Sequence, residues 1–189
     1  YWPGNSSPDP WGTNYAGHFL LEAKKRGYAV SESMISKWIG SQTEEAERWT
    51  PTSGRHSNML TQAYRLYTLA IAKNPALGAM NRMKELSELS GQSRFRLALA
   101  YAIAGYEEEA MDLILNEVAN YENVRDGDIY TYGSPIRDKA MILETLTHLG
   151  KKEDAFALVR EIAQEMGNKN KWMSTQTTAY SFIGIAEYV

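Results

Sequence analysis

Three histidines are the first residues to consider for acid–base or metal chemistry. They are His18, His56 and His148, and no two of them have the spacing of a metal site such as HExxH. An isolated histidine seldom acts as a ligand or a base, so we expect each to be structural or on the surface. The chain has no cysteine, which excludes disulfides, thiolate metal sites and cysteine nucleophiles within it.

Acidic residues offer two further candidates. The stretch Asp126–Asp128 could belong to a calcium loop, but it lacks the spaced oxygen ligands and the closing glutamate, so a solvated turn fits it better. Glu107–Glu109 opens a predicted helix, where carboxylates stabilise the positive end of the dipole. Since no GxSxG, GxGxxG or P-loop motif occurs either, we predict no catalytic residue, no metal, no cofactor and no enzyme.

Aromatic residues near the predicted starts of helices could have two roles. Exposed rings stack on sugars, and a glycosidase would add a pair of Asp or Glu side chains about 5 to 10 Å apart. Alternatively, the rings wedge between helices and fix their packing. We favour this second interpretation because Trp and Tyr are common at half-buried junctions. The rings in question belong to Tyr1, Trp2, Trp11, Tyr15, Tyr130, Tyr132 and Trp172.

The elements that must position these residues are helices. Apolar residues recur at helical spacing, for example from Phe95 to Ile103 and from Ala155 to Met166, and we count about nine helices of about 12 to 18 residues. Asn74 and Ser134 each precede a proline and are expected to cap a helix. Glycines mark the expected helix ends, at Gly27, Gly91, Gly105, Gly150 and Gly167.

A helical hairpin repeats along the sequence. Gly105 aligns with Gly150 and Ala110 with Ala155, an offset of 45 residues in both cases. A helix, a glycine turn and a second helix with a period of about 40 to 47 residues are typical of helical-hairpin arrays, whereas the tetratricopeptide repeat has a period of about 34. A protein-interaction adaptor built from such an array would form an open superhelix, and this alternative stays open at the level of sequence.

Composition restricts the partners. With 189 residues, 43% of them hydrophobic, the chain can form one domain with its own core. The formal net charge of −3 comes without a basic stretch, so we expect no nucleic-acid partner. The longest apolar run, Leu97–Gly105, is about half the roughly 20 residues of a membrane-spanning helix, so we expect no direct membrane insertion.

Several stretches together resemble one known family. Residues 1–23, 60–72, 96–110, 132–146 and 172–188 are similar, in the same order, to the helical thioester domain of the alpha-2-macroglobulins, particularly the bacterial branch. The most specific motif is Trp-x-Ser-Thr-Gln before the last helix. The residues that match family motifs, which we expect to be structural, are Trp2, Gly4, Trp11, His18, Gly105, Tyr132, Gly133, Arg137, Asp138, Trp172, Ser174, Thr175 and Gln176.

The resemblance implies an all-α fold, an α/α toroid in which helical hairpins form a ring. It implies that residues 1–189 are a single domain, the later part of a thioester domain, with an opening loop at 1–12 and hairpins over 13–189. We therefore expect an incomplete ring. We also expect Trp172 to pack under the last helix and Gln176 to hydrogen-bond the backbone of its own loop, residues 169–175.

The function that the resemblance implies is protease inhibition. In the family, cleavage of a bait region triggers a conformational change that traps the protease, and a thioester in a C-x-E-Q motif can capture it covalently. That motif is absent from these residues, and Gln176 is not one of its partners. The chain would then be a non-catalytic scaffold segment of a broad-spectrum inhibitor in the periplasm or cell envelope.

The partners implied are the other domains of a parent chain and, through that parent, target proteases. We also expect self-association through the two end helices of the array, whose apolar faces would be left uncovered. The side chains on these faces are Tyr15, Phe19, Leu20, Phe182, Ile183 and Ala186.

Overall fold

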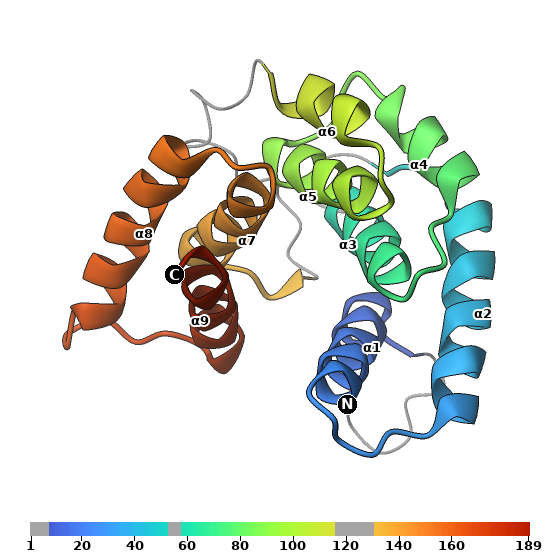
Figure 1. Cartoon of the computed structure of the whole chain (residues 1–189), viewed down its shortest axis with the longest axis horizontal. Helices are drawn as coiled ribbons and strands as arrows, with labels where there is room; N and C mark the ends of the chain where they lie inside the picture. Colours follow the sequence, from blue (N-terminus) through green and yellow to red (C-terminus); the bar gives the residue numbers. More distant parts are fainter. Residues whose placement is uncertain (1–7, 53–57, 116–130) are drawn as a thin grey trace.

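The computed structural model describes residues 8–52, 58–115 and 131–189. Within these ranges the chain forms nine helices and no strand, which confirms the all-α prediction (Figure 1). In chain order the helices are α1 (Pro10–Lys25), α2 (Glu32–Arg48), α3 (Met59–Ile71), α4 (Leu77–Lys84), α5 (Gly91–Ile103), α6 (Glu107–Ile114), α7 (Pro135–His148), α8 (Lys152–Gly167) and α9 (Thr175–Tyr188).

The helices alternate between an inner and an outer layer. The odd-numbered helices surround the centre of the molecule and the even-numbered helices pack outside them (Figure 1). Each inner helix contacts the next one, from α1 through α3, α5 and α7 to α9. Burial follows the same division, because every residue from Met59 to Ala70 of α3 is buried, whereas α2 buries only Ile35, Gln42 and Ala46. The hairpins thus form the predicted ring.

Tight turns connect each inner helix to the outer helix that follows it. Gly27, Gly105 and Gly150 have φ angles of 84°, 89° and 69°, and Lys73 at the corresponding turn after α3 has a φ of 59°. This left-handed conformation suits glycine, since a Cβ atom strains it. The predicted helix ends at these three glycines are confirmed, and α8 ends at Gly167 as expected.

Some expected helix bounds are wrong. Gly91 begins α5 rather than ending a helix, because the Ser90 side chain accepts from the Ser93 N–H and caps α5. Asn74 caps no helix: α4 begins at Leu77, and Asn74 Nδ2 donates to Thr43 Oγ1 at 3.0 Å. Helices α4 and α6 each have 8 residues and are shorter than expected.

The start of α1 also differs from the expectation. The opening loop was expected over residues 1–12, yet α1 begins at Pro10 because the Asp9 carboxylate accepts from the Gly12 N–H at 2.6 Å. Proline fits the first helical position, where its missing N–H leaves no bond unmade. The same arrangement confirms the predicted cap of α7, in which Ser134 precedes Pro135.

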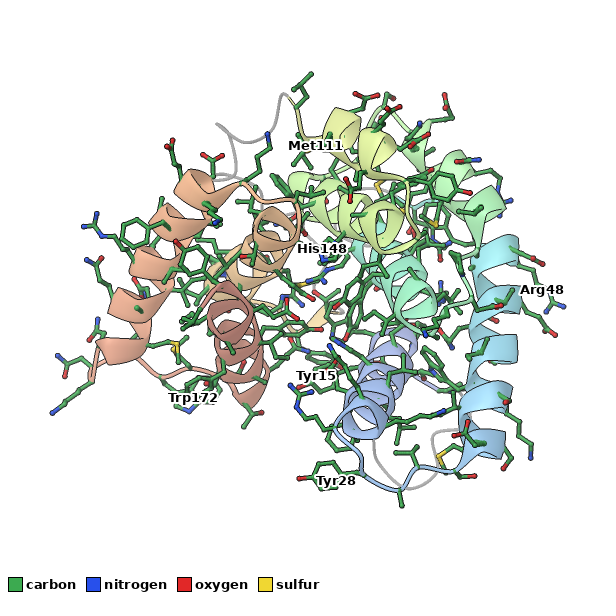
Figure 2. The ribbon with its side chains drawn as sticks, viewed as in Figure 1. Tyr15, Tyr28, Arg48, Met111, His148 and Trp172 are labelled. Atoms are coloured by element: carbon green, nitrogen blue, oxygen red, sulfur yellow. The ribbon has the colours of Figure 1, made fainter. Side chains whose placement is uncertain are left out.

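The first and last helices of the ring are in contact along only part of their length. Tyr15 of α1 and Tyr180 of α9 lie with their ring centroids 6.0 Å apart, and in Figure 2 the labelled Tyr15 lies between the two helices. Further along both helices a groove of about 750 Å³ opens between Leu20 of α1 and Ile183 of α9. We call it the edge groove, lined by residues 19, 20, 22, 23, 26, 28–31, 34 and 183. The ring is therefore incomplete, as expected.

No helix within the described ranges combines the length and the apolar composition that crossing a bilayer requires.

Candidate functional site

The rim cluster is a set of buried polar contacts on the side of the ring where α1, α7 and α9 begin; its residues are Trp11, Thr131, Arg137, Asp138 and Gln176. Arg137 donates from Nη1 to the Thr131 carbonyl at 3.2 Å and from Nη2 to Thr131 Oγ1 at 3.1 Å. Its Nε donates to Asp138 Oδ1 at 2.6 Å. The guanidinium carbon lies 4.8 Å from the centroid of the Trp11 ring, a cation–π distance.

Gln176 completes the rim cluster from the first turn of α9. With the amide oriented so that both of its ends have partners, its nitrogen donates to the carbonyls of Thr131 and Tyr132 at 3.1 and 3.2 Å, and its oxygen accepts from Trp11 Nε1 at 2.7 Å. The predicted bond from Gln176 to backbone is thus present, but its partners were predicted wrongly. The side chain lies toward α1 and the start of α7, so it binds residues 131 and 132 instead of its own loop.

Trp172 does not pack under the last helix. Its side chain is 86% exposed, in the loop between α8 and α9 (Figure 2). The first turn of α9 contacts the start of α7 through Thr177 Oγ1, which lies 2.8 Å from Ser134 Oγ, and Trp172 lies at the surface beside this contact. Tyr132 is likewise 72% exposed, so the wedge interpretation holds for the buried Trp11 and fails for these two rings.

A second buried cluster, the ionic centre, lies at mid-height in the ring and consists of His18, Tyr64, Tyr67, Arg96 and Glu144. Arg96 Nη1 donates to Glu144 Oε2 at 2.7 Å, and the Tyr67 hydroxyl donates to the other oxygen of the same carboxylate. His18 Nδ1 lies 3.0 Å from the Tyr64 hydroxyl. These five side chains come from α1, α3, α5 and α7, so the ionic centre joins four inner helices.

Burial sets the protonation states in the ionic centre. It lowers the pKa of His18, while the charge of Glu144 acts in the opposite direction. Burial also raises the pKa of Tyr64 and of Tyr67 well above the usual value for tyrosine. For Arg96, burial is the largest single effect and would lower the pKa, but the neighbouring groups, with the charge of Glu144 first among them, together raise it. Arg96 therefore stays charged among neutral rings.

Two aromatic rings stabilise the buried guanidinium of Arg96, which has fewer hydrogen bonds than it has donors. Arg96 is 0% exposed, and its Nε and Nη2 atoms have no hydrogen-bond partner among the described residues. The Tyr67 ring centroid lies 4.3 Å from the guanidinium carbon and the Tyr64 centroid 6.0 Å. Stacked rings partly replace the missing hydrogen bonds, because their electron-rich faces attract the cation.

The remaining candidate residues are spread over the chain. Glu107–Glu109 lie in the first turn of α6, as predicted, and His148 lies in the last turn of α7, where a cation is favourable. Gly105 forms a turn and Thr175 begins α9 with an exposed side chain. Tyr1, Trp2, Gly4, His56, Asp126–Asp128 and Tyr130 lie outside the described residues.

Sequence reasoning missed the two charged members of the ionic centre. Arg96 directly precedes the apolar run Leu97–Gly105, and Glu144 interrupts the apolar stretch that begins at Met141. A charge beside or within an apolar helix face is a usable signal, because a buried charge needs a partner. They lie 48 positions apart, so the sequence did not show that each is the other's partner.

A second groove, the aromatic groove, has a volume of about 470 Å³ and lies between the starts of α7 and α9 and the end of α8. It is lined by residues 132–136, 139, 161, 165, 171–174 and 177. The two carboxylates on it are ion-paired, Glu161 with Lys139 and Glu165 with Lys171. Paired carboxylates do not supply the free acid and base of a glycosidase. Within the described ranges, no group of three or more His, Cys, Asp or Glu side chains is placed to hold a metal ion.

The two clusters therefore connect helices to one another. Their polar side chains contact each other and present no reactive group at the surface. The rim cluster joins α1, α7 and α9, while the ionic centre joins α1, α3, α5 and α7. Contact between α1 and α9 also distinguishes the ring from the open superhelix of a repeat adaptor, whose first and last helices lie far apart.

Comparisons with known proteins agree with this architecture. No protein-family model matches the sequence. The chain is 29% identical to the alpha-2-macroglobulin of Xylella fastidiosa over 93% of its own length, and 27% identical to that of Escherichia coli K12 over 96%. It spans 12% of the length of each of these relatives.

Solved structures show the same fold. A mutant of the Salmonella alpha-2-macroglobulin aligns with a TM-score of 0.81 and 24% identity, covering 98% of this chain and 13% of that one. The trypsin-activated alpha-2-macroglobulin of Escherichia coli aligns with a TM-score of 0.77 and 22% identity, covering 97% of this chain and 13% of that one.

The fold is thus an all-helical ring of the α/α toroid type. In both sequence and fold the chain is similar to a segment of the bacterial alpha-2-macroglobulins, which confirms the resemblance seen in its motifs.

Proposed function

We propose that the chain is a non-catalytic scaffold segment of a bacterial alpha-2-macroglobulin-like, broad-spectrum protease inhibitor. The proposal rests on the two buried clusters. The rim cluster joins α1, α7 and α9, and the ionic centre joins α1, α3, α5 and α7, so together they connect all five inner helices. A protein that traps by conformational change needs parts that move as units. A ring held by bonds between inner helices is such a unit.

The location and partners follow from the same proposal. The segment would work in the periplasm or cell envelope, in contact with other domains of a parent chain, and would meet target proteases through that parent. Since the chain has no cysteine, covalent capture by a thioester would depend on residues outside these 189.

A trapping assay tests the proposal. The parent protein, preincubated with trypsin, should strongly reduce cleavage of a large protein substrate and leave cleavage of a small peptide substrate nearly unchanged. This difference arises because an enclosed protease still admits small molecules. The 189-residue chain alone should change neither rate. Inhibition or peptide hydrolysis by the chain alone would contradict a scaffold role.

Self-association through the edge groove is the remaining part of the proposal. Phe19 is 68% exposed there, and several such apolar side chains on one face favour a partner. Light scattering of the chain should show an average mass above that of the monomer at raised concentration. Phe19→Ser should lower that mass, whereas the control Phe156→Ser, at a 51% exposed position on α8, should not.

A further inference from the structure

The aromatic groove carries two aromatic rings that are exposed to solvent. Trp172 and Tyr132 line it and are 86% and 72% exposed, the first from the loop before α9 and the second from the residues before α7. Large rings left in solvent cost free energy unless something covers them at times. These two rings do not wedge between helices, as Trp11 does.

Buried side chains hold Tyr132 in place. Its φ angle is 50°, a conformation that is uncommon for a bulky residue. The Gln176 amide donates to its carbonyl, and Arg137 and Gln176 both donate to the carbonyl of the preceding Thr131. A Cβ atom on the following Gly133 would lie 2.0 Å from Arg137 Nη2, so a larger residue there would displace the guanidinium that bonds Thr131. Strain of this kind persists where the surroundings over-determine it, and such places are commonly binding sites.

The polar groups of the aromatic groove already bind one another. Lys139 pairs with Glu161 and Lys171 pairs with Glu165, so the two positive and two negative charges on the groove cancel. The hydroxyls of Ser134, Thr177 and Ser174 form a chain of hydrogen bonds. What the groove offers a ligand is therefore ring faces and apolar surface.

We propose that the aromatic groove binds an extended, uncharged peptide segment that contains prolines. A polyproline II segment places flat, apolar proline rings between aromatic side chains and leaves its carbonyls free. The exposed Trp172 ring carries an N–H that can donate to such a carbonyl. A sugar would need several unengaged hydrogen-bonding groups, and a charged ligand would need net charge, and this groove supplies neither.

Titration of the 189-residue chain with a capped decaproline peptide tests the proposal. The chain has five tryptophans, so labelling them with ¹⁵N gives few indole signals, and Trp172→Phe identifies the signal of Trp172. We expect a saturable shift of that signal. The fluorescence anisotropy of a labelled decaproline should show a Kd at least about ten-fold higher for Trp172→Ala and for Tyr132→Asn. Such a rise corresponds to a loss of about 1.4 kcal/mol of binding free energy.

Matched variants separate binding from folding. Asparagine tolerates a positive φ, so Tyr132→Asn removes the ring with little strain, and an unchanged Trp11 indole signal would show an intact rim cluster. Phe156→Ala, at a 51% exposed position of α8 outside the groove, should bind decaproline like the parent chain. Absence of a saturable shift, equal loss in Phe156→Ala, or a shift produced by an N-acetylglucosamine tetrasaccharide and not by decaproline would each overturn the proposal.

Discussion

The guanidinium of Arg96 and the carboxylate of Glu144 form an ion pair of 2.7 Å with 0% and 4% of their side chains exposed. Arg96→Met should lower the free energy of unfolding by about 3 to 5 kcal/mol, because it leaves the charge of Glu144 buried without its partner. Urea unfolding of the 189-residue chain measures this change.

The double variant Arg96→Met, Glu144→Leu provides the control for that experiment. It should recover a large part of the lost stability, since replacing both members of a buried ion pair by apolar groups is often close to neutral. A double variant less stable than Arg96→Met would show that Glu144 contributes mainly through its other partner, Tyr67.

Replacing either of two glycines of the first hairpin by alanine should change the free energy of unfolding in opposite directions. A Cβ atom on Gly17 would lie 2.0 Å from Trp38 Cε2, and Trp38 is held by a bond from its Nε1 to the Thr13 carbonyl. Gly17→Ala should therefore cost about 1 to 3 kcal/mol through overpacking. Gly40→Ala meets nothing within 4 Å and should add about 1 kcal/mol, the gain in helix propensity. Thermal melts that rank the two variants the other way would contradict the packing of α2 on α1.

Removal of the Gln176 amide tests the rim cluster. Gln176→Leu leaves the carbonyls of Thr131 and Tyr132 and the N–H of Trp11 without this partner, so it should lower the free energy of unfolding by about 1 to 3 kcal/mol. Gln164→Leu, on the exposed face of α8, should stay within about 0.5 kcal/mol of the parent chain. Equal stabilities of the two variants would exclude a structural role for Gln176.

Glu187 gives the chain a pH dependence with a definite sign. Burial, followed by the nearby charge of Glu144, raises the pKa of Glu187 from 4.5 to about 7. The folded chain then holds a proton that the unfolded chain releases, so the free energy of unfolding should fall as the pH rises from about 4.5 to about 7. Because Glu187 is exposed at the end of α9, solvent screens the effect, and the slope should be much smaller than for a buried carboxyl.

Comparison of Glu187→Gln with the parent chain isolates this slope. The lowered pKa of His18 acts in the opposite direction, since that contribution to stability is lost as the pH falls below 6.5. His18 is present in both proteins, so its contribution cancels in the difference. A difference between the two stabilities that does not change over this pH range would show that Glu187 has an ordinary pKa.

The fold was predictable because its signals are local. Apolar periodicity and the glycine turns at Gly105 and Gly150 predicted the hairpins, and Ser134 before a proline predicted the start of α7. The errors arose where a tertiary contact outweighed a local signal. Asn74 bonds Thr43 of another helix instead of capping its own, a choice that no short window of sequence contains.

The site was predictable in its residues and less so in their contacts. Trp11, Arg137, Asp138 and Gln176 were named from their motifs, and they do lie together. Their partner Thr131 was not named, because no motif included it, although it lies only six positions from Arg137. Of the ionic centre only His18 was named, since the bonds there join residues more than 40 positions apart. The exposure of Trp172 could not be foreseen either, because it depends on the path of the chain between α8 and α9 and not on the residues next to it in sequence.

The ring has two sides that differ in how well they tolerate inserted residues. The less tolerant side carries the positive-φ turns at Gly27, Lys73, Gly105 and Gly150. These turns use few residues, and each depends on one residue in a rare backbone conformation, so an inserted residue there would alter how an outer helix lies on its inner partner. Each connection that leads back into an inner helix is longer than the turn that precedes it. New segments could be added on that side at small cost to the ring, so variants of this scaffold should acquire new contacts on one side and keep the other fixed.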